Sequence, residues 1–434
     1  MNGVVTSASG ICYEPFEPGI QARSIELYQR LRDEAPVYRT DAGYWAVSRY
    51  ADVKEIFRHP ERFSSKANQS EGLGLDMDLA ADADPAMLEN LMRVASGMTV
   101  DLGELFSAEA LVAADPPHHT RLRRIVNRGF VPRRIAQLEG QVQTAVDECL
   151  AGIETADEYE VVSRLAVPLP VRTIADLLSV DPADYRRVKD WTIQLGEVQG
   201  PLRGTPEVLA VVVDMFKSFS DYFVPRIDAR KAEPRDDLIS DLVRAAESDI
   251  LTTAESLLFI FQLMAAGNET TTSAITNMVL ALKRNPEQYE LLMQRPELLP
   301  NAIEEIVRYR PPLQVLFRTA LVDAELSGVS IPAGSTIALL VGAANLDPRQ
   351  FDEPDRFDIT RDTSSMIGFG FGIHNCIGAH LARSEMRLAM SGLLPHLSRF
   401  ELADEPLTYR PSYMMYNLEQ VRLLAPASRL APTG

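Results

Sequence analysis

The chain has 434 residues, 46% of them hydrophobic and 24% charged, a composition that allows a large buried core and is not that of a disordered protein. The formal net charge is −18, which argues against nucleic-acid binding because neutralising phosphates requires a basic face. No apolar run approaches the roughly 20 residues that a membrane helix requires, and the first residues lack the charged and apolar regions of a signal peptide, so we expect a cytoplasmic protein that does not enter a membrane.

Helical patterns dominate the first two thirds of the chain. Apolar residues recur at helical spacing in segments 24–37, 51–59, 137–153, 170–178 and 208–231. Strand signals occur near 36–50 and again near 320–345, where turn residues separate short alternating runs. No Gly/Ser-rich linker, charge block or internal repeat divides the chain, so we expect a single domain over 1–434, mainly α with small β-sheets (α+β).

One segment has a charge opposite to that of the whole chain. Residues 116–138, the basic segment, contain six arginines and no acidic residue. Such a segment is either a docking surface for an acidic partner or an ordinary solvated face that pairs with acids from elsewhere in the fold.

The longest helical pattern begins at Thr252 and stops before Pro286. Thr252 and Glu255 have the spacing of a capping box, in which each side chain bonds the backbone amide of the other residue. The middle of the pattern, 265–272, is rich in weak helix formers within an otherwise apolar segment. We expect a local opening of the hydrogen-bond ladder there; the alternative is a polar turn on the surface.

Another helical pattern ends at Pro311 and places Glu305 three residues before Arg308. Side chains at this spacing share one face of a helix and can form an ion pair, although most such pairs are solvated and contribute little. The later stretch Glu-Pro-Asp-Arg-Phe, 353–357, supplies a further arginine. We expect Arg356 to complete a buried network with this pair, the Glu305 network.

Cys376 lies among glycines, directly before an amphipathic helical pattern. The other cysteines, Cys12 and Cys149, are distant in sequence and no Cys-x-x-Cys spacing occurs, so neither a disulfide framework nor a zinc site is supported. An isolated cysteine is most often a small buried hydrophobic residue. Here the glycines allow backbone to approach a flat bulky group and the helix start favours an anion, which an axial thiolate ligand to haem iron requires.

The residues around Cys376 resemble the haem-binding signature of the cytochrome P-450 superfamily, Phe-x-x-Gly-x-(Arg/His)-x-Cys-x-Gly. The matching residues are Phe369, Gly372, His374, Cys376 and Gly378. Further motifs occur in the family's order, namely Ala-Gly-Asn-Glu-Thr (266–270), Glu-x-x-Arg (305–308) and Pro-Asp-Arg-Phe (354–357). The resemblance covers nearly the whole chain and implies the bacterial soluble type of this family, with a helical body around a buried haem.

The resemblance implies a role for most of these residues. Cys376 would be the thiolate ligand of haem b, and the residues shaping its surroundings would be Phe369, Gly372 and Gly378. The side chains implied to bind the haem propionates are those of His119, Arg123, Arg318 and His374. The Glu305 network, with Arg308 and Arg356, would fix the core behind the thiolate segment.

The resemblance also implies a monooxygenase that inserts one atom of dioxygen into a hydrophobic small molecule by hydroxylation or epoxidation. Glu269 and Thr270 would order water and deliver protons in a largely dry site. The residues implied to line the substrate pocket are Gln262, Ala265, Ala266, Gln314, Val315 and Met415. Gln262 and Gln314 would bond a substrate oxygen or would instead point into neighbouring backbone. Terpenoid, steroid, fatty-acid and polyketide substrates are all compatible with these residues.

Electrons would come from NAD(P)H through a ferredoxin reductase and a ferredoxin to a monomeric enzyme. Arg121, Arg124 and Arg128 cannot all face the same way as Arg123, so some point to solvent and are expected to form a positive docking patch. Two other functions would use the same haem-binding residues. A peroxide-driven haem-thiolate peroxygenase would need no reductase partners, and a non-catalytic haem sensor would need neither a proton relay nor a substrate pocket.

Overall fold

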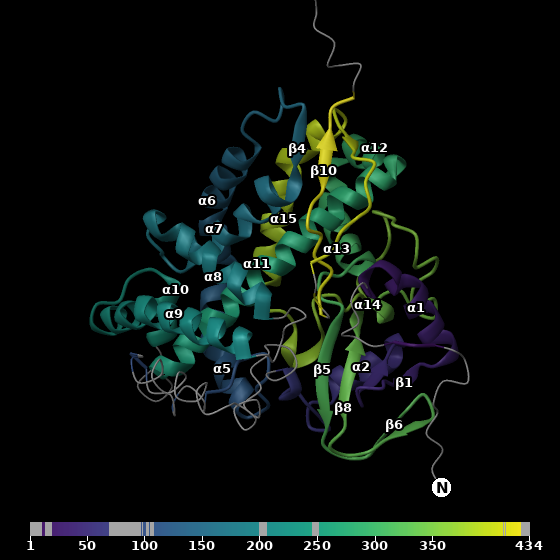
Figure 1. The fold of residues 1–434 in the computed structure, drawn as a ribbon, viewed down its shortest axis with the longest axis horizontal. Helices are drawn as coiled ribbons and strands as arrows, with labels where there is room; N and C mark the ends of the chain where they lie inside the picture. Colours follow the sequence, from purple (N-terminus) through teal and green to yellow (C-terminus); the bar gives the residue numbers. More distant parts are fainter. Residues whose placement is uncertain are drawn as a thin grey trace, which may run out of the picture.

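The structure is a computed structural model of the chain. It describes residues 11–13, 20–68, 97, 99–100, 104, 108–198, 206–244, 251–410, 412 and 414–426. Most of these residues are helical, and the helices gather in one body beside a smaller region of sheet (Figure 1). The fold class is therefore mainly α with small sheets, as the sequence predicts.

The helices overlap every helical segment predicted from the sequence. In chain order they are α1 (Ile20–Glu34), α2 (Tyr50–Arg58), α5 (His118–Val126), α6 (Pro132–Leu150), α7 (Pro168–Leu177), α8 (Tyr185–Val198), α9 (Pro206–Ala232), α10 (Leu238–Val243), α11 (Thr253–Arg284), α12 (Pro286–Gln294), α13 (Leu299–Tyr309), α14 (Val341–Ala344) and α15 (Ala379–Leu397). Short turns of tighter or wider helix are η3 (Asn127–Phe130), η4 (Val162–Ala166), η5 (Pro182–Asp184), η6 (Pro296–Leu298) and η7 (Gly372–His374).

Helix α11 crosses the middle of the helical body (Figure 1) and contacts α7, α9, α13 and α15. The predicted capping box is present: the Glu255 amide donates to Thr252 Oγ1 at 3.0 Å, and the Thr252 amide donates to Glu255 Oε2 at 2.8 Å. These bonds satisfy two amides that a helix start otherwise leaves without partners. The start of this central helix is therefore encoded locally in the sequence.

The expected opening in the middle of α11 is wrong, and so is the alternative of a surface turn. Residues 265–272 remain helical. The Thr270 hydroxyl donates to the carbonyl oxygen of Ala266 at 2.6 Å, one turn earlier. Threonine can satisfy its hydroxyl within a helix in this way, so the weak helix formers do not interrupt the backbone ladder.

In the part of the chain that the structure describes, strands form three small sheets at the edges of the helical body. The main sheet has the order β1-β2-β8-β5-β3, with β1 (Val37–Arg39), β2 (Trp45–Val47), β8 (Thr336–Leu340), β5 (Val315–Ala320) and β3 (Phe63–Ser64). A three-stranded sheet joins β4 (Glu158–Glu160), β10 (Arg422–Leu424) and β9 (Glu401–Leu402), and a hairpin joins β6 (Ala324–Leu326) and β7 (Val329–Ile331). In the main sheet Arg318 of β5 lies opposite Ile337 of β8, which fixes where its side chain can reach.

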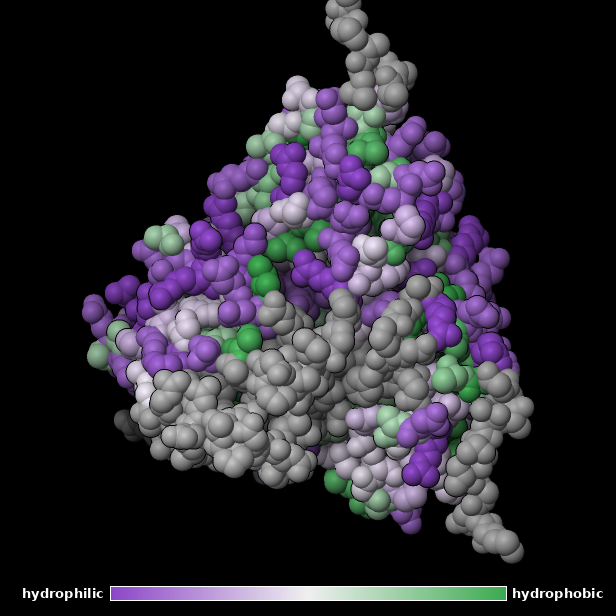
Figure 2. All heavy atoms as spheres, in the orientation of Figure 1, coloured by the Kyte–Doolittle hydropathy of each residue, from purple (hydrophilic) through white to green (hydrophobic). Residues whose placement is uncertain are grey.

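The core lies between α11 and the helices that surround it, where aliphatic and aromatic side chains are buried together. Hydrophilic side chains cover most of the described surface on the face in Figure 2. None of the helices that the structure describes is long and apolar enough to cross a membrane.

Candidate functional site

A cavity lies between α11, β5, α15 and the glycine-rich segment that precedes α15. It encloses about 1470 Å³ of space, including its opening to solvent. Most of its wall is apolar, and polar side chains reach it at a few points. Cavities of this kind, with few polar groups in an apolar wall, are typical of sites for cofactors and small molecules.

Cys376 faces this cavity at the start of α15. Its amide donates to the carbonyl oxygen of Phe369 at 2.8 Å, which closes the segment into a loop. Gly370 and Gly372 have φ angles of +74° and +70°, values that favour glycine. A Cβ atom at Gly372 would also lie 2.8 Å from the carbonyl oxygen of Phe57, so the backbone path around Cys376 depends on these glycines.

Gly378 differs from these glycines, because neither its φ angle nor its contacts with other protein atoms require a glycine at this position. Its φ is negative, and a Cβ atom there would meet Cys376 Sγ at 3.9 Å, an ordinary contact. The missing side chain instead keeps free the space in front of the Cys376 sulfur, on the wall of the cavity. The loop therefore leaves room for a group that approaches the sulfur closely.

The thiol of Cys376 has opposing electrostatic influences. It is accessible from the cavity although protein atoms surround it. Burial raises the pKa of the Cys376 thiol, whereas the amides of Gly378 and Ala379 and the charges of Arg123 and Arg383 lower it. A metal cation bound to the sulfur would add the charge needed to stabilise a thiolate. The donor is therefore suited to a single bond to a metal.

Four nitrogen-bearing side chains from distant parts of the chain converge beside the cavity: His119, Arg123, Arg318 and His374. The ring centroids of His119 and His374 are 4.3 Å apart, and the other two side chains line the cavity with His374. Burial and neighbouring positive charge lower the pKa of His119 to about 4 and the pKa of His374 to about 2. Both imidazoles are therefore neutral near pH 7, with one N–H donor each.

This cluster has donors that the protein leaves unused. Nε2 of His119 is buried without a hydrogen-bond partner in the part of the chain that the structure describes. Burial lowers the pKa of Arg318 to about 10, and Asp115 opposes this effect, although Asp115 itself accepts from the Ser65 amide at 2.8 Å. Burial also lowers the pKa of Arg123. An anionic group would relieve the cost of burying these two arginines, so the cluster fits a ligand that carries carboxylates.

The two residues of the predicted proton relay lie on α11 but face different surroundings. Thr270 lines the cavity, together with Ala266 and Gly267. Glu269 contacts the C-terminal segment, where Asn417 Nδ2 donates to its Oε2 at 3.4 Å. Burial raises the pKa of Glu269 to about 7, against the opposing influence of Arg410 and Asn417. A carboxyl with this pKa can accept and donate a proton near neutral pH.

Of the residues expected to line a substrate pocket, Gln262 and Ala266 lie on the cavity wall. The described cavity wall does not include the other members of that set, whose contact with substrate stays a prediction: Ala265, Gln314, Val315 and Met415. Gln314 points into backbone, where its Nε2 donates to the carbonyl oxygen of Pro311. Gln262 also bonds backbone, since its Oε1 accepts from the Leu111 amide at 3.0 Å.

Several apolar residues of the cavity wall were missed by sequence analysis. They include Ile174 of α7 and Phe259 and Leu263 of α11. Phe259 and Leu263 precede Ala266 by about two turns and one turn of α11, so they share one face of that helix. The sequence feature that could have identified Phe259 and Leu263 is their helical spacing from Ala266.

A buried carboxyl on α15 was also missed. Glu385 is 2% exposed and lines the cavity, and its Oε1 has no hydrogen-bond partner among the described residues. Burial raises the pKa of Glu385 to about 8, opposed by a hydrogen bond with Thr173 of α7. An acidic residue one turn after Leu381, on the apolar face of the helical pattern, was the signal in the sequence.

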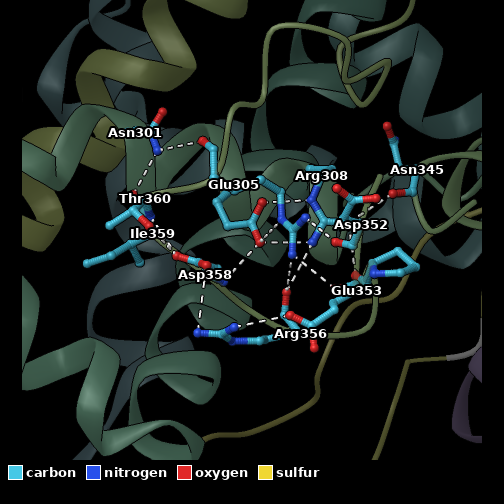
Figure 3. Close-up of polar contacts among 12 residues, drawn as sticks. Asn301, Glu305, Arg308, Asn345, Asp352, Glu353, Arg356, Asp358, Ile359 and Thr360 are labelled. Atoms are coloured by element: carbon cyan, nitrogen blue, oxygen red, sulfur yellow. Dashed lines mark hydrogen bonds and ion pairs between the residues drawn. The ribbon is translucent and has the colours of Figure 1, made fainter. Parts of the chain in front are cut away.

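The Glu305 network is buried, but its third arginine differs from the prediction. Glu305 and Arg308 on α13 have no exposed side-chain surface, and two hydrogen bonds of 2.7 and 2.8 Å join them (Figure 3). Arg361 Nε completes the group at 3.3 Å from Glu305 Oε1. The Arg356 side chain is 58% exposed and pairs with Glu353, whereas its backbone carbonyl oxygen accepts from Arg308 Nη2 at 3.3 Å.

The basic segment forms α5, η3 and the start of α6, and part of its charge is neutralised. Arg121 pairs with Glu255 of α11, and Arg134 pairs with Asp236. The expectation that Arg121 contributes to a free positive patch is therefore corrected, because an acid from another element balances its charge. The arginines exposed in this segment are Arg124, Arg128 and Arg133.

Comparisons with known proteins agree with this architecture. A family model, Cytochrome P450, matches residues 206–418. The chain is 35% identical to cytochrome P450 CYP107DY1 of Priestia megaterium, over 89% of this chain and 93% of that protein. It is 31% identical to linalool 8-monooxygenase of Pseudomonas putida, over 90% of this chain and 92% of that protein.

The solved structures give the same result. Cytochrome P450 CYP109Q5 from Chondromyces apiculatus matches with a TM-score of 0.80 and 31% identity, over 96% of this chain and 98% of that chain. The relatives are similar along nearly their whole length, so the likeness includes the elements that build the cavity. The chain belongs to the cytochrome P450 family of haem-dependent monooxygenases.

Proposed function

We propose that Cys376 is the thiolate ligand of haem b in a monooxygenase that acts on a hydrophobic small molecule. The observation that carries the proposal is the position of the Cys376 thiol, which faces the cavity at the start of α15. The space kept by Gly378 and the unused donors of the nearby cluster fit the iron and carboxylates of this cofactor. Haem b, when bound, supplies an iron at which dioxygen is activated, and thiolate ligation favours O–O cleavage.

His119, Arg123, Arg318 and His374 hold the propionates in this proposal. The two arginines supply charge and the two neutral imidazoles supply N–H donors, so each carboxylate can receive charge-assisted hydrogen bonds. Nε2 of His119, which is buried without a partner in the described structure, would gain one. Phe369 and Gly372 shape the loop that carries the sulfur, and Arg383 lies 4.3 Å from the Phe369 ring centroid, which holds that ring in place.

Glu269 and Thr270 deliver protons in this proposal. The Thr270 hydroxyl gives its hydrogen to Ala266, so its oxygen retains lone pairs that can accept a hydrogen bond from water. Thr270 therefore orders a water molecule in the cavity. Glu269 does not line the cavity, so in this proposal it would exchange protons with that water through a further water molecule; its pKa of about 7 lies near the working pH.

We expect Thr270→Ala to leave haem content and substrate affinity nearly unchanged while NAD(P)H consumption separates from product formation. The alanine cannot hold the water that carries protons, so more of the consumed NAD(P)H yields hydrogen peroxide. Product and peroxide are measured per NAD(P)H oxidised. Thr276→Ala is the matched control, since the Thr276 hydroxyl also bonds a carbonyl of α11 but is buried in the core. Equal coupling in both variants would contradict the role of Thr270.

The substrate is expected to be apolar, because the free wall of the cavity is built from side chains such as Phe259, Leu263 and Leu313. Apolar surface removed from water on binding contributes roughly 25 cal/mol per Å². The reaction is hydroxylation or epoxidation of such a molecule. The similarity to linalool 8-monooxygenase supports a small apolar alcohol or hydrocarbon as the first compounds to test for a shift of the haem absorption band.

A ferredoxin and its NAD(P)H-dependent reductase supply the electrons in this proposal. Arg128 of η3 and Arg133 of α6 are exposed on either side of Val131 in sequence, and Val131 is apolar and 44% exposed. On a chain of net charge −18, this positive patch would steer an acidic partner by long-range attraction. The patch follows α5 in the chain, and α5 carries His119 and Arg123.

Charge reversal within the patch tests the docking surface. We expect Arg128→Glu to lower the ferredoxin-dependent rate several-fold at low ionic strength and progressively less as salt is added, because salt screens the attraction. Peroxide-supported turnover and haem content stay unchanged. Arg186→Glu, at an exposed position of α8, is the control and leaves both rates unchanged. Equal losses in the ferredoxin and peroxide assays would place the docking surface elsewhere.

The same assays separate the proposed function from its alternatives. A monooxygenase turns over with NAD(P)H, ferredoxin and reductase. Turnover with peroxide and none with the redox partners would identify a peroxygenase. Ligand-induced absorption changes without turnover in either assay would identify a haem sensor. Both of these outcomes contradict the proposal.

A further inference from the structure

The C-terminal segment packs along α11 beside the acidic residue of the proposed relay. Ser273 of α11 donates to the carbonyl oxygen of Tyr416 at 2.8 Å. The next residue, Asn417, is 5% exposed, and its Nδ2 lies 3.4 Å from Glu269 Oε2. Oδ1 of Asn417 is buried and has no hydrogen-bond partner in the described residues. The side-chain amide therefore uses one of its two polar ends and leaves the other unused beside a carboxyl.

Glu269 occupies surroundings in which both of its protonation states are accessible. Burial disfavours its charged form, whereas Arg410 and Asn417 favour it. The backbone of Arg410 donates to the Asn417 carbonyl oxygen at 2.8 Å, so both influences come from one short stretch of chain. A group that gives and takes protons must be held in place in each state, or it leaves its position when its charge changes.

An asparagine amide suits this requirement because it has a donor end and an acceptor end. The N–H of Asn417 can donate to a Glu269 carboxylate. When Glu269 is protonated its O–H becomes a donor, and rotation of the Asn417 amide about its last side-chain bond would present Oδ1 as the acceptor. We propose that Asn417 is a positioning residue that holds the Glu269 carboxyl in both protonation states. This rests on the proposed proton relay of Glu269 and Thr270.

Infrared spectroscopy tests the contact without requiring catalysis. The difference spectrum between wild type and Glu269→Gln identifies the carbonyl band of protonated Glu269. We expect Asn417→Leu to move this band to higher frequency, because the carboxyl loses its hydrogen bond, and to raise the pH at which the band disappears, because the amide no longer stabilises the carboxylate. Asn277→Leu, which removes another buried amide contact of α11, is the control and leaves the Glu269 band unchanged.

Coupling of NAD(P)H consumption to product tests whether the contact matters for turnover. We expect Asn417→Leu to increase peroxide release several-fold, and Asn417→Gln, which keeps the amide, to restore part of the coupling. In a Glu269→Gln background the Asn417→Leu change should add no further loss, because a residue that acts through Glu269 has no effect once the carboxyl is gone.

Two results would overturn the proposal. An unchanged Glu269 band in Asn417→Leu would show that the amide does not hold the carboxyl, whether or not the enzyme turns over. Additive coupling losses in the double variant would show that Asn417 acts by another route. If Asn417→Leu does not fold, Asn417→Ala, which also removes the amide, carries the same test, and a band identical to wild type in that variant contradicts the contact. Absence of any turnover in the wild type would instead contradict the proposed function alone.

Discussion

We expect that replacing Cys376 with serine abolishes thiolate ligation of haem. A serine hydroxyl is far less acidic than a thiol and is a harder ligand, so it does not supply the anionic sulfur that the iron requires. The side chains proposed to hold the propionates, those of His119, Arg123, Arg318 and His374, would remain. Some haem can therefore bind without its bond to sulfur. We therefore expect lower haem content and loss of the red-shifted absorption band that the reduced carbon monoxide complex of the wild type shows.

The other cysteines provide the control for this experiment. Cys149 is half-buried on α6, where burial raises its pKa to about 11, and it does not line the cavity. Cys149→Ser should therefore keep both haem content and the absorption band. A Cys376→Ser protein that retains the thiolate band, or a wild type that lacks it, would remove the basis for the proposed chemistry.

Features set by neighbouring residues could be predicted from the sequence. The capping box of Thr252 and Glu255 is a local motif whose two hydrogen bonds need no tertiary contact. The path around Cys376 follows in the same way from glycines whose φ angles other residues avoid. Glu305 and Arg308 also meet because helical spacing alone brings them together. In each case the sequence contains both partners within a few positions.

Features that depend on how distant segments meet could not be predicted. Arg361 lies 56 positions after Glu305 and Arg356 lies in the same segment, and the path of that segment decides which arginine enters the network. Gln314 was placed near the cavity by its position, but its side chain donates to the carbonyl oxygen of Pro311. The contact between Glu269 and Asn417 joins residues 148 positions apart. The period of the hydrophobic pattern and the secondary-structure propensities of single residues contain no information about such pairings.

Within the Glu305 network, the replacement of Arg308 is expected to lower stability most. Arg308 pairs with Glu305 and donates to the carbonyl oxygens of Asn345 and Pro354 at 2.9 and 3.0 Å, so it joins α13 to the segment before the cysteine loop. Arg308→Leu removes the main charged partner of the buried Glu305 carboxylate and leaves these carbonyls without the donor that Arg308 supplies. Breaking a buried pair in this way costs about 3–5 kcal/mol, which chemical denaturation of the holoprotein would measure as a lower midpoint.

Comparing Arg361→Leu with Arg356→Leu tests which of the two arginines is the third member of the buried Glu305 network. Arg361 is 11% exposed and lies 3.3 Å from Glu305, so Arg361→Leu should cost less than Arg308→Leu but clearly more than a surface change. The exposed pair of Arg356 with Glu353 is worth about 0–1 kcal/mol, so Arg356→Leu should leave the midpoint nearly unchanged. If Arg356→Leu destabilised the protein as much as Arg361→Leu, the third member would be the residue predicted from the sequence, because only a buried partner of Glu305 can carry that cost.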